Sequence, residues 1–211
     1  MDVRVLVCGV ALVSAFAVGG IGAAQANLLT NGSFETGDLT GWTQSGGTSE
    51  TIVTNQIYAG STGAEQGAYY VHEGEFNTDP GMLSQTFSDA VGQTLLVSGW
   101  VIDNGNGGPA NVQFIFDGTT EENINMTAPP TGNSPSPDVW TEYSFDVTAT
   151  GSDTFALSYF DNPSCDGLDN FSVTAEVSST PLPATLPLFA GGLGLMGFLG
   201  LRQKRKASAA A

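Results

Sequence analysis

Hydrophobic and polar side chains alternate along much of the chain between residues 27 and 177. The three clearest runs place their apolar members at every second position: Val112, Phe114 and Phe116; Tyr143, Phe145 and Val147; Phe155, Leu157 and Tyr159. A period of two is typical of β-strands with one buried face. No stretch of helix length in this region has a period of 3.6 residues. The pattern therefore predicts strands throughout residues 27–177.

Further strand-like runs fill the intervals between these three. They cover residues 27–35, 51–58, 68–72, 83–87, 94–102 and 171–177. Clusters of Gly, Asn, Asp and Pro separate them, as at 103–108 and in the loop 128–138. About nine short strands at this spacing predict an all-β fold, an antiparallel β-sandwich of one domain. We place this domain at residues 27–177.

The first 26 residues have the features of a secretory signal peptide. Arg4 precedes an apolar run over residues 5–18, and the small residues Ala24 and Ala26 flank Gln25. This small-x-small pattern is the usual cleavage site of an exported protein. We expect cleavage after Ala26, with the rest of the chain exported.

The last residues, 178–211, combine an apolar run with a cationic end. Residues 182–201 carry no charge, and about 20 such residues suffice for one transmembrane helix. Four of the five basic residues follow directly: Arg202, Lys204, Arg205 and Lys206. Clustered basic residues stay on the cytoplasmic side, so the domain should face outward. A permanent membrane anchor is one interpretation of this tail.

A short Pro-rich motif before the helix suggests a second interpretation. Residues Pro181, Leu182, Pro183 and Ala184 follow Thr180. Together with the Gly-rich apolar run and the basic end, this motif resembles the PEP-CTERM class of bacterial sorting signals, in its VPLPA-CTERM variant, with Thr180 in place of Val. The resemblance implies an exosortase-type membrane protease as partner. It also implies removal of the helix and delivery to the cell surface or the extracellular exopolysaccharide matrix.

The charge of the domain is strongly negative. The sequence has 21 Asp and Glu residues, and all but Asp2 lie between residues 27 and 180, a segment without Lys or Arg. Phosphate contacts need cations, so the composition excludes nucleic acid as a partner. Self-repulsion favours solubility and should be relieved by salt or by divalent cations.

Two motifs at the ends of the domain carry a second resemblance. They are the segment 27–35 (NLLTNGSFE), leading to Gly41 and Trp42, and the segment 162–173 (NPSCDGLDNFSV). With the strand 83–87 between them, they resemble galactose-binding-like jelly rolls, a group that includes carbohydrate-binding modules. The resemblance implies that the first and last strands lie close together.

The same resemblance implies a structural calcium ion between these strands, with Glu35 and Asp169 as candidate ligands. Calcium prefers carboxylate and carbonyl oxygens. The alternative is local: Glu35 caps a turn and Asp169 accepts a hydrogen bond within its own turn.

Sugar binding is the second functional hypothesis. Protein sites for sugars combine aromatic rings with amide and carboxylate hydrogen bonds. The candidate rings are Trp42, Trp100 and Trp140, with Tyr69 and Tyr70 as further candidates. Each could equally be part of the core of a sandwich.

Catalysis finds little support in the residue types present. His72 is the only histidine, Cys165 is the only cysteine outside the signal peptide, and no Gly-x-Ser-x-Gly motif occurs. We therefore expect a non-catalytic protein of the cell surface or the exopolysaccharide-associated matrix. The alternatives are a carbohydrate-binding module for matrix or external glycans, and a permanently anchored envelope protein.

Overall fold

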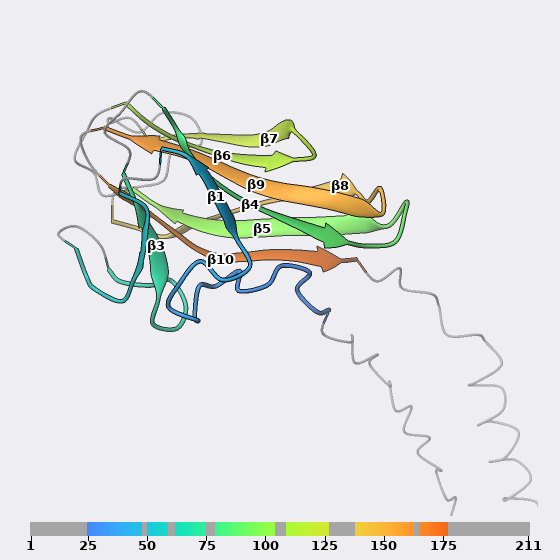
Figure 1. Cartoon of the computed structure of the whole chain (residues 1–211), viewed down its shortest axis with the longest axis horizontal. Coiled ribbons are helices and arrows are strands. Elements are labelled where there is room, and N and C mark those ends of the chain that lie inside the picture. The colour runs from blue at the N-terminus through green and yellow to red at the C-terminus, as the bar shows by residue number, and fades with distance from the viewer. Residues whose placement is uncertain are drawn as a thin grey trace, which may run out of the picture.

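In a computed structural model, the described residues form an antiparallel β-sandwich (Figure 1) whose regular elements are ten strands. The structure describes residues 25–47, 50–58, 62–74, 79–103, 109–126, 138–162 and 165–176. Every regular element among them is a strand. The predictions for residues 1–24 and 178–211, including Ala24 of the expected cleavage motif and the transmembrane helix, lie outside the described residues. Within the part described, no helix has the length and apolar character of a membrane span.

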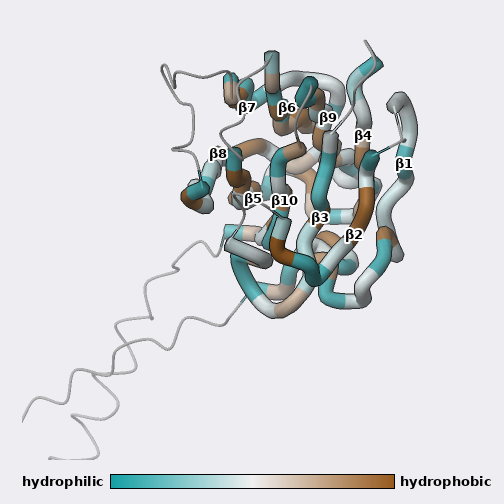
Figure 2. The backbone as a smooth tube through the Cα atoms, turned by 90° about the vertical axis from the view of Figure 1, so that its left-hand side faces the viewer, coloured by the Kyte–Doolittle hydropathy of each residue, from teal (hydrophilic) through white to brown (hydrophobic). Residues whose placement is uncertain are grey.

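Five strands form each sheet. The first sheet has the order β1-β4-β9-β6-β7 and the second has the order β2-β3-β10-β5-β8. Figure 2, turned by 90° from Figure 1, shows these two layers facing each other. The bounds in the first sheet are β1 Thr43–Gly46, β4 Gly81–Ser88, β9 Ser152–Asp161, β6 Ala110–Phe116 and β7 Thr119–Asn125. Those in the second are β2 Ile52–Thr54, β3 Tyr70–Glu73, β10 Asp166–Ala175, β5 Thr94–Ile102 and β8 Thr141–Thr148.

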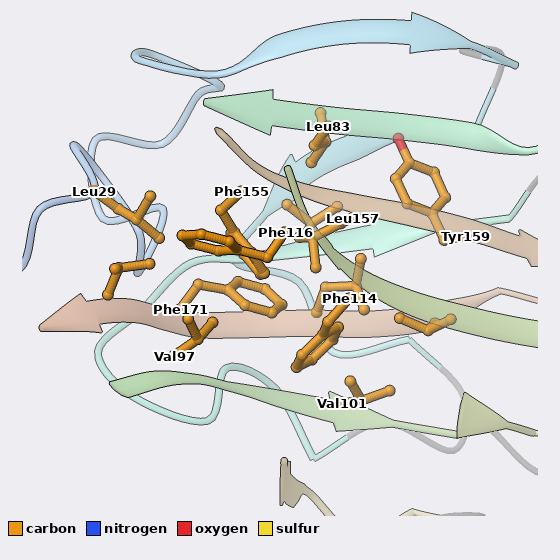
Figure 3. Close-up of a cluster of buried hydrophobic side chains, with 14 of the residues drawn as sticks. Leu29, Leu83, Val97, Val101, Phe114, Phe116, Phe155, Leu157, Tyr159 and Phe171 are labelled. Atoms are coloured by element: carbon orange, nitrogen blue, oxygen red, sulfur yellow. The ribbon is translucent and has the colours of Figure 1, made fainter. Parts of the chain in front are cut away.

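The core lies between the sheets and is built from the alternating residues of the sequence pattern. Phe114, Phe155 and Leu157 of the first sheet are fully buried, as are Val101 and Phe171 of the second. Figure 3 shows these side chains pointing toward one another from the two layers. The predicted alternation on β6, β8 and β9 is therefore confirmed.

The expected strand over residues 27–35 is wrong in its local structure. This segment is a series of turns in which Asn31 and Phe34 have φ values of 54° and 55°. Gly32 lies so close to β10 that an added Cβ would be 2.1 Å from the carbonyl oxygen of Phe171. The segment is therefore a compact turn against β10.

The expected proximity of the two end motifs is confirmed. Leu28 N–H donates to the Val173 carbonyl (2.8 Å), and Phe171 N–H donates to the Gly32 carbonyl (2.9 Å). The side chain of Asn27 bonds both strand residues, because its Nδ2 donates to Phe171 O and its Oδ1 accepts from Val173 N–H.

Candidate functional site

Strand alternation gives the first sheet an outward face whose residues are set by the register. Directly opposite residues on antiparallel strands project to the same side. One such row runs across all five strands: Ser45, Met82, Ser158, Gln113 and Asn123. A parallel row contains Thr43, Ser84, Ala156, Ile115 and Thr120. The outward side chains are thus aligned in rows that cross the five strands, and together they form an array.

None of the side chains in this array is charged. We call the array the uncharged face, and its members are Thr43, Ser45, Met82, Ser84, Thr86, Ser88, Asn111, Gln113, Ile115, Thr120, Asn123, Asn125, Ser152, Thr154, Ala156, Ser158 and Phe160. The charged residues of these strands lie elsewhere. Asp153 and Asp161 point inward and are buried, Glu122 is opposite the inward Phe114, and Glu121 occupies a bulge on the edge strand β7. The absence of charge is thus a property of one side of the sheet.

The three central strands of the uncharged face carry apolar side chains among polar ones. Met82, Ala156 and Ile115 lie on the adjacent strands β4, β9 and β6; Met82 and Ile115 are half-buried, and Ala156 is 7% exposed. Phe160 lies on the same face of β9, opposite Asn111, and its ring is half-buried. Sugar rings have apolar faces bordered by hydroxyl groups, so apolar side chains that alternate with hydroxyl and amide side chains are chemically suited to them.

Hydrogen bonds within the uncharged face hold parts of it in place. The hydroxyls of Thr86 and Thr154 are 2.8 Å apart. Asn111 Nδ2 donates to Asn123 Oδ1 (2.6 Å) and to the Ile124 carbonyl (3.0 Å). Fixed side chains lose less conformational entropy when a ligand binds, so these contacts preorganise the array.

The outward face of the second sheet differs from the uncharged face in two ways: it carries charged side chains, and a segment of the chain lies over one end of it. It carries Glu142 and Asp146 on β8, and the apolar Leu96 is 37% exposed there. At one end the segment 62–69 lies over it. Trp140 Nε1 donates to the Gly63 carbonyl (3.0 Å), and the Trp140 ring packs edge-on against Tyr70.

Two of the three candidate tryptophans, Trp100 and Trp140, lie on the outward side of the second sheet, and the third lies in the core. Trp42 is 8% exposed and packs in the core against Phe34 and Phe171, so the structure gives it a packing role instead of the predicted surface role. Trp140 is half-buried beneath segment 62–69. Trp100 is half-buried on the outward face of the second sheet, opposite Glu142 and Asp169. Phe160 of the uncharged face was missed, although its large apolar side chain is out of phase with Phe155, Leu157 and Tyr159.

The candidate calcium ligands Glu35 and Asp169 both contact segment 65–69. Glu35 Oε1 accepts from the N–H groups of Ala68 and Tyr69, both at 2.9 Å. Asp169 Oδ2 accepts from Glu65 N–H (2.8 Å) and Gln66 N–H (3.2 Å). The two side chains thus fix neighbouring parts of one segment, from the first turns and from the last strand.

The environment of Asp169 is unusual for a carboxylate. It is fully buried, and burial raises its pKa to about 7 although three backbone N–H groups act in the opposite direction. Carboxylate oxygens such as those of Glu35 and Asp169 are the kind of ligand that calcium prefers. Among the described residues, however, no three or more His, Cys, Asp or Glu side chains are grouped as metal ligands. In this structure the backbone of segment 65–69 satisfies the carboxylates of Glu35 and Asp169.

His72 and Cys165 are placed unfavourably for nucleophilic chemistry. The His72 ring is stacked on Tyr58 at a centroid distance of 4.0 Å, and burial lowers its pKa. Burial, followed by the negative charge of Glu73, raises the pKa of the Cys165 thiol to about 12. The thiol is therefore protonated at neutral pH and a poor nucleophile.

This chain is similar in fold to several domains of known structure. The sequence matches no known protein-family profile and no curated protein. A carbohydrate-binding module, TmCBM61, solved with β-1,4-galactotriose, is 20% identical with a TM-score of 0.56, covering 72% of this chain and 99% of the module. The K1 cleaved adhesin domain of Lys-gingipain from Porphyromonas gingivalis is 16% identical, with a TM-score of 0.50. The match covers 69% of this chain and 96% of that domain. The chain therefore shares the jelly-roll fold of such modules.

Proposed function

We propose that this protein is a non-catalytic glycan-binding module and that the uncharged face is its binding surface. The observation that carries the proposal is the segregation of charge. A domain with twenty carboxylates and no Lys or Arg keeps the aligned positions of the uncharged face free of charge and lines them with hydroxyl, amide and apolar side chains. Self-repulsion alone would favour spreading the carboxylates evenly. Hydrogen bonding and ring packing to a sugar chain account for their exclusion.

The shared fold supports this proposal. The neighbour TmCBM61 was solved with a β-1,4-linked galactotriose, so the fold can carry a glycan site. A protein that binds glycans can take part in the exopolysaccharide matrix through that binding. A structural role in the matrix is therefore compatible with the proposed glycan-binding function.

The cellular context of the proposal comes from the two ends of the sequence. A signal peptide at 1–26 would export the domain, and the tail at 178–211 would hold it on the outer side of the membrane until an exosortase-type protease acts. Mass spectrometry of the mature protein separates the two fates of this tail. A C-terminus near Pro181–Ala184 means sorting and release, whereas retention of Arg202–Lys206 in the membrane fraction means a permanent anchor.

Calcium is the ion that we propose as a structural component. Glu35 and Asp169 would hold it, together with oxygens of segment 65–69, and it would neutralise a fully buried carboxylate in a domain without cationic side chains. The carboxylates would then join the first turns to β10 through the ion as well as through segment 65–69.

Affinity electrophoresis in gels that contain soluble β-1,4-galactan, xylan or dextran tests the binding function. We expect retardation by at least one of these chains, and loss of most of it in Phe160→Ala. The matched control is Leu96→Ala, which removes an exposed apolar side chain from the outward face of the other sheet. If retardation falls equally in both variants, or is unchanged in Phe160→Ala, the uncharged face is not the binding surface.

A further inference from the structure

The distribution of carboxylates around the uncharged face bears on which glycans can bind it. The face itself has no charged side chain, but exposed carboxylates border it. Asp117 lies in the turn between β6 and β7, Glu121 occupies the bulge on β7, and Asp79 precedes β4. No Lys or Arg occurs anywhere between residues 27 and 180 to offset them. A ligand on this face therefore meets a neutral surface inside a negative border.

Resting on the glycan-binding function proposed above, we infer that the ligand is an uncharged polysaccharide chain and that glycans bearing uronate, sulfate or phosphate groups are excluded. The negative potential of the border extends over roughly 8 Å at physiological salt, which reaches across much of the array. An anionic chain would lose binding to this repulsion, while the hydroxyls of a neutral chain would not.

The dimensions of the array favour a chain over a single sugar. Neighbouring strands are about 4.8 Å apart, so a row across five strands extends roughly 19 Å. The row Ser45, Met82, Ser158, Gln113 and Asn123 offers a hydroxyl, an apolar side chain, a second hydroxyl and two amides in that order. Such a series can contact successive units of one extended chain lying across the strands. The ligand class is thus a neutral polysaccharide bound along its length.

The border carboxylates also predict how the selectivity can be changed. Ser158 lies at the centre of the row, on the middle strand β9. A cation placed there by Ser158→Lys should attract the anionic chains that the native face repels. Ser144 is exposed on β8 of the other sheet, so Ser144→Lys adds the same net charge at a distance from the face.

Titration calorimetry with β-1,4-galactan, xylan, dextran and polygalacturonate, in 0.15 M salt with a chelator, tests the inference. For the wild type we expect a neutral chain to bind at least about tenfold more tightly than polygalacturonate. Ser158→Lys should raise the affinity for polygalacturonate severalfold, and Ser144→Lys should not. Glu121→Gln should raise the affinity for polygalacturonate slightly, and high salt should reduce all these differences.

The outcomes separate this inference from the function on which it rests. If no chain of either kind binds the wild-type protein, the glycan-binding function itself fails. If polygalacturonate binds as tightly as the neutral chains in chelator, the function stands and the neutral ligand class is overturned. If Ser144→Lys and Ser158→Lys act equally, the selectivity does not arise at this face. Binding of polygalacturonate in calcium alone would mean that bridging ions select an anionic ligand, and it would also overturn the inference.

Discussion

The two sheets use their outward faces in different ways. The outward face of the second sheet carries Glu142 and Asp146, and one end lies under a segment held by Asp169 and Trp140. The uncharged face of the first sheet carries no charged side chain, and the pairs Thr86–Thr154 and Asn111–Asn123 are hydrogen-bonded within it. Within the described residues, the second sheet's outward face therefore holds a segment of the chain through charged and aromatic side chains, whereas the uncharged face offers hydroxyl, amide and apolar groups. The candidate site is thus distinguished by its lack of charge, not by exposed tryptophans.

The largest expected effect comes from breaking the core that both sheets share. Phe171 is fully buried and its ring packs against Phe34, Trp42, Phe114 and Phe155 at centroid distances of 5.4 to 6.3 Å. Phe171→Ala should lower the free energy of unfolding by about 3–5 kcal/mol. Urea denaturation measures this change.

The control for Phe171→Ala is Thr174→Ala, on the outward side of the same strand, which should change the free energy of unfolding by about 0.5 kcal/mol or less. A Phe171→Ala loss as small as that of the control would mean that the aromatic cluster is not what joins the sheets.

The stability of the second sheet should depend on pH through Asp169. The pKa of Asp169 is about 7 in the folded protein and about 3.9 in an unfolded chain. Between these values the folded protein keeps a proton that the unfolded chain has released. Asp169 therefore makes stability fall as pH rises from about 4 to 7, by up to about 4 kcal/mol.

Urea denaturation at pH 4.5 and pH 7.5 measures this contribution as a difference between proteins. Asp169→Ala should show a smaller loss across this range than the wild type. Asp146→Ala, an exposed carboxylate on the same sheet face, should follow the wild type. Identical pH profiles for the wild type and Asp169→Ala would show that the carboxyl is ionised throughout the range.

Calcium should act on the same sheet and leave the uncharged face unaffected. At a concentration of about 100 times the dissociation constant, a bound ion adds about 2.7 kcal/mol to the free energy of unfolding. We expect a higher Tm in millimolar calcium than in chelator, and no such shift in Glu35→Gln or Asp169→Asn. A wild-type Tm that is the same in both buffers would exclude the structural ion.

A smaller effect is expected where the first turns meet the first sheet. Gln85 points inward from β4, where its Oε1 accepts from Thr30 N–H (2.6 Å) and its Nε2 donates to the Thr30 carbonyl (3.0 Å). Gln85→Met keeps the length of the side chain but leaves both backbone groups without this partner, at a cost of about 1–3 kcal/mol. Ser88→Ala, exposed on the same strand, is the control in urea denaturation, and an equal effect of the two would contradict the role of Gln85.

Much of the fold could be predicted from single-strand periodicity. The run 94–102 coincides with β5, and the aromatic alternation of β6, β8 and β9 identifies the core. The pattern misled at residues 27–35, where Leu28, Leu29 and Phe34 imitate a strand. There the left-handed φ of Asn31 and of Phe34 produces turns instead.

Two strands were missed for a physical reason. β1 and β7 lie at the edges of the first sheet, and β7 has a single buried residue, Ile124, so neither shows the apolar alternation. The turn before β7 did carry a signal, because Asp117 and Gly118 are both left-handed, at φ 47° and 78°. An Asp-Gly pair of this kind is typical of a tight hairpin.

The candidate site was less accessible to sequence reasoning than the fold. Phe160 is visible as an apolar residue out of phase with its strand, but its neighbours on the face come from four other strands. Which residues share that face depends on the register between neighbouring strands. The periodicity within one strand does not predict this register. The calcium candidates were found through a motif, and their joint contact with segment 65–69 emerged only from the folded chain.

Hydrogen–deuterium exchange of the domain with and without a saturating neutral chain, such as β-1,4-galactan or xylan, tests the central claim most directly. We expect slower amide exchange in β4, β6 and β9 of the first sheet, with β5 and β8 of the second sheet unchanged. Protection confined to β5 and β8, or to segment 62–69 over them, would contradict it and would place the ligand on the charged side of the sandwich.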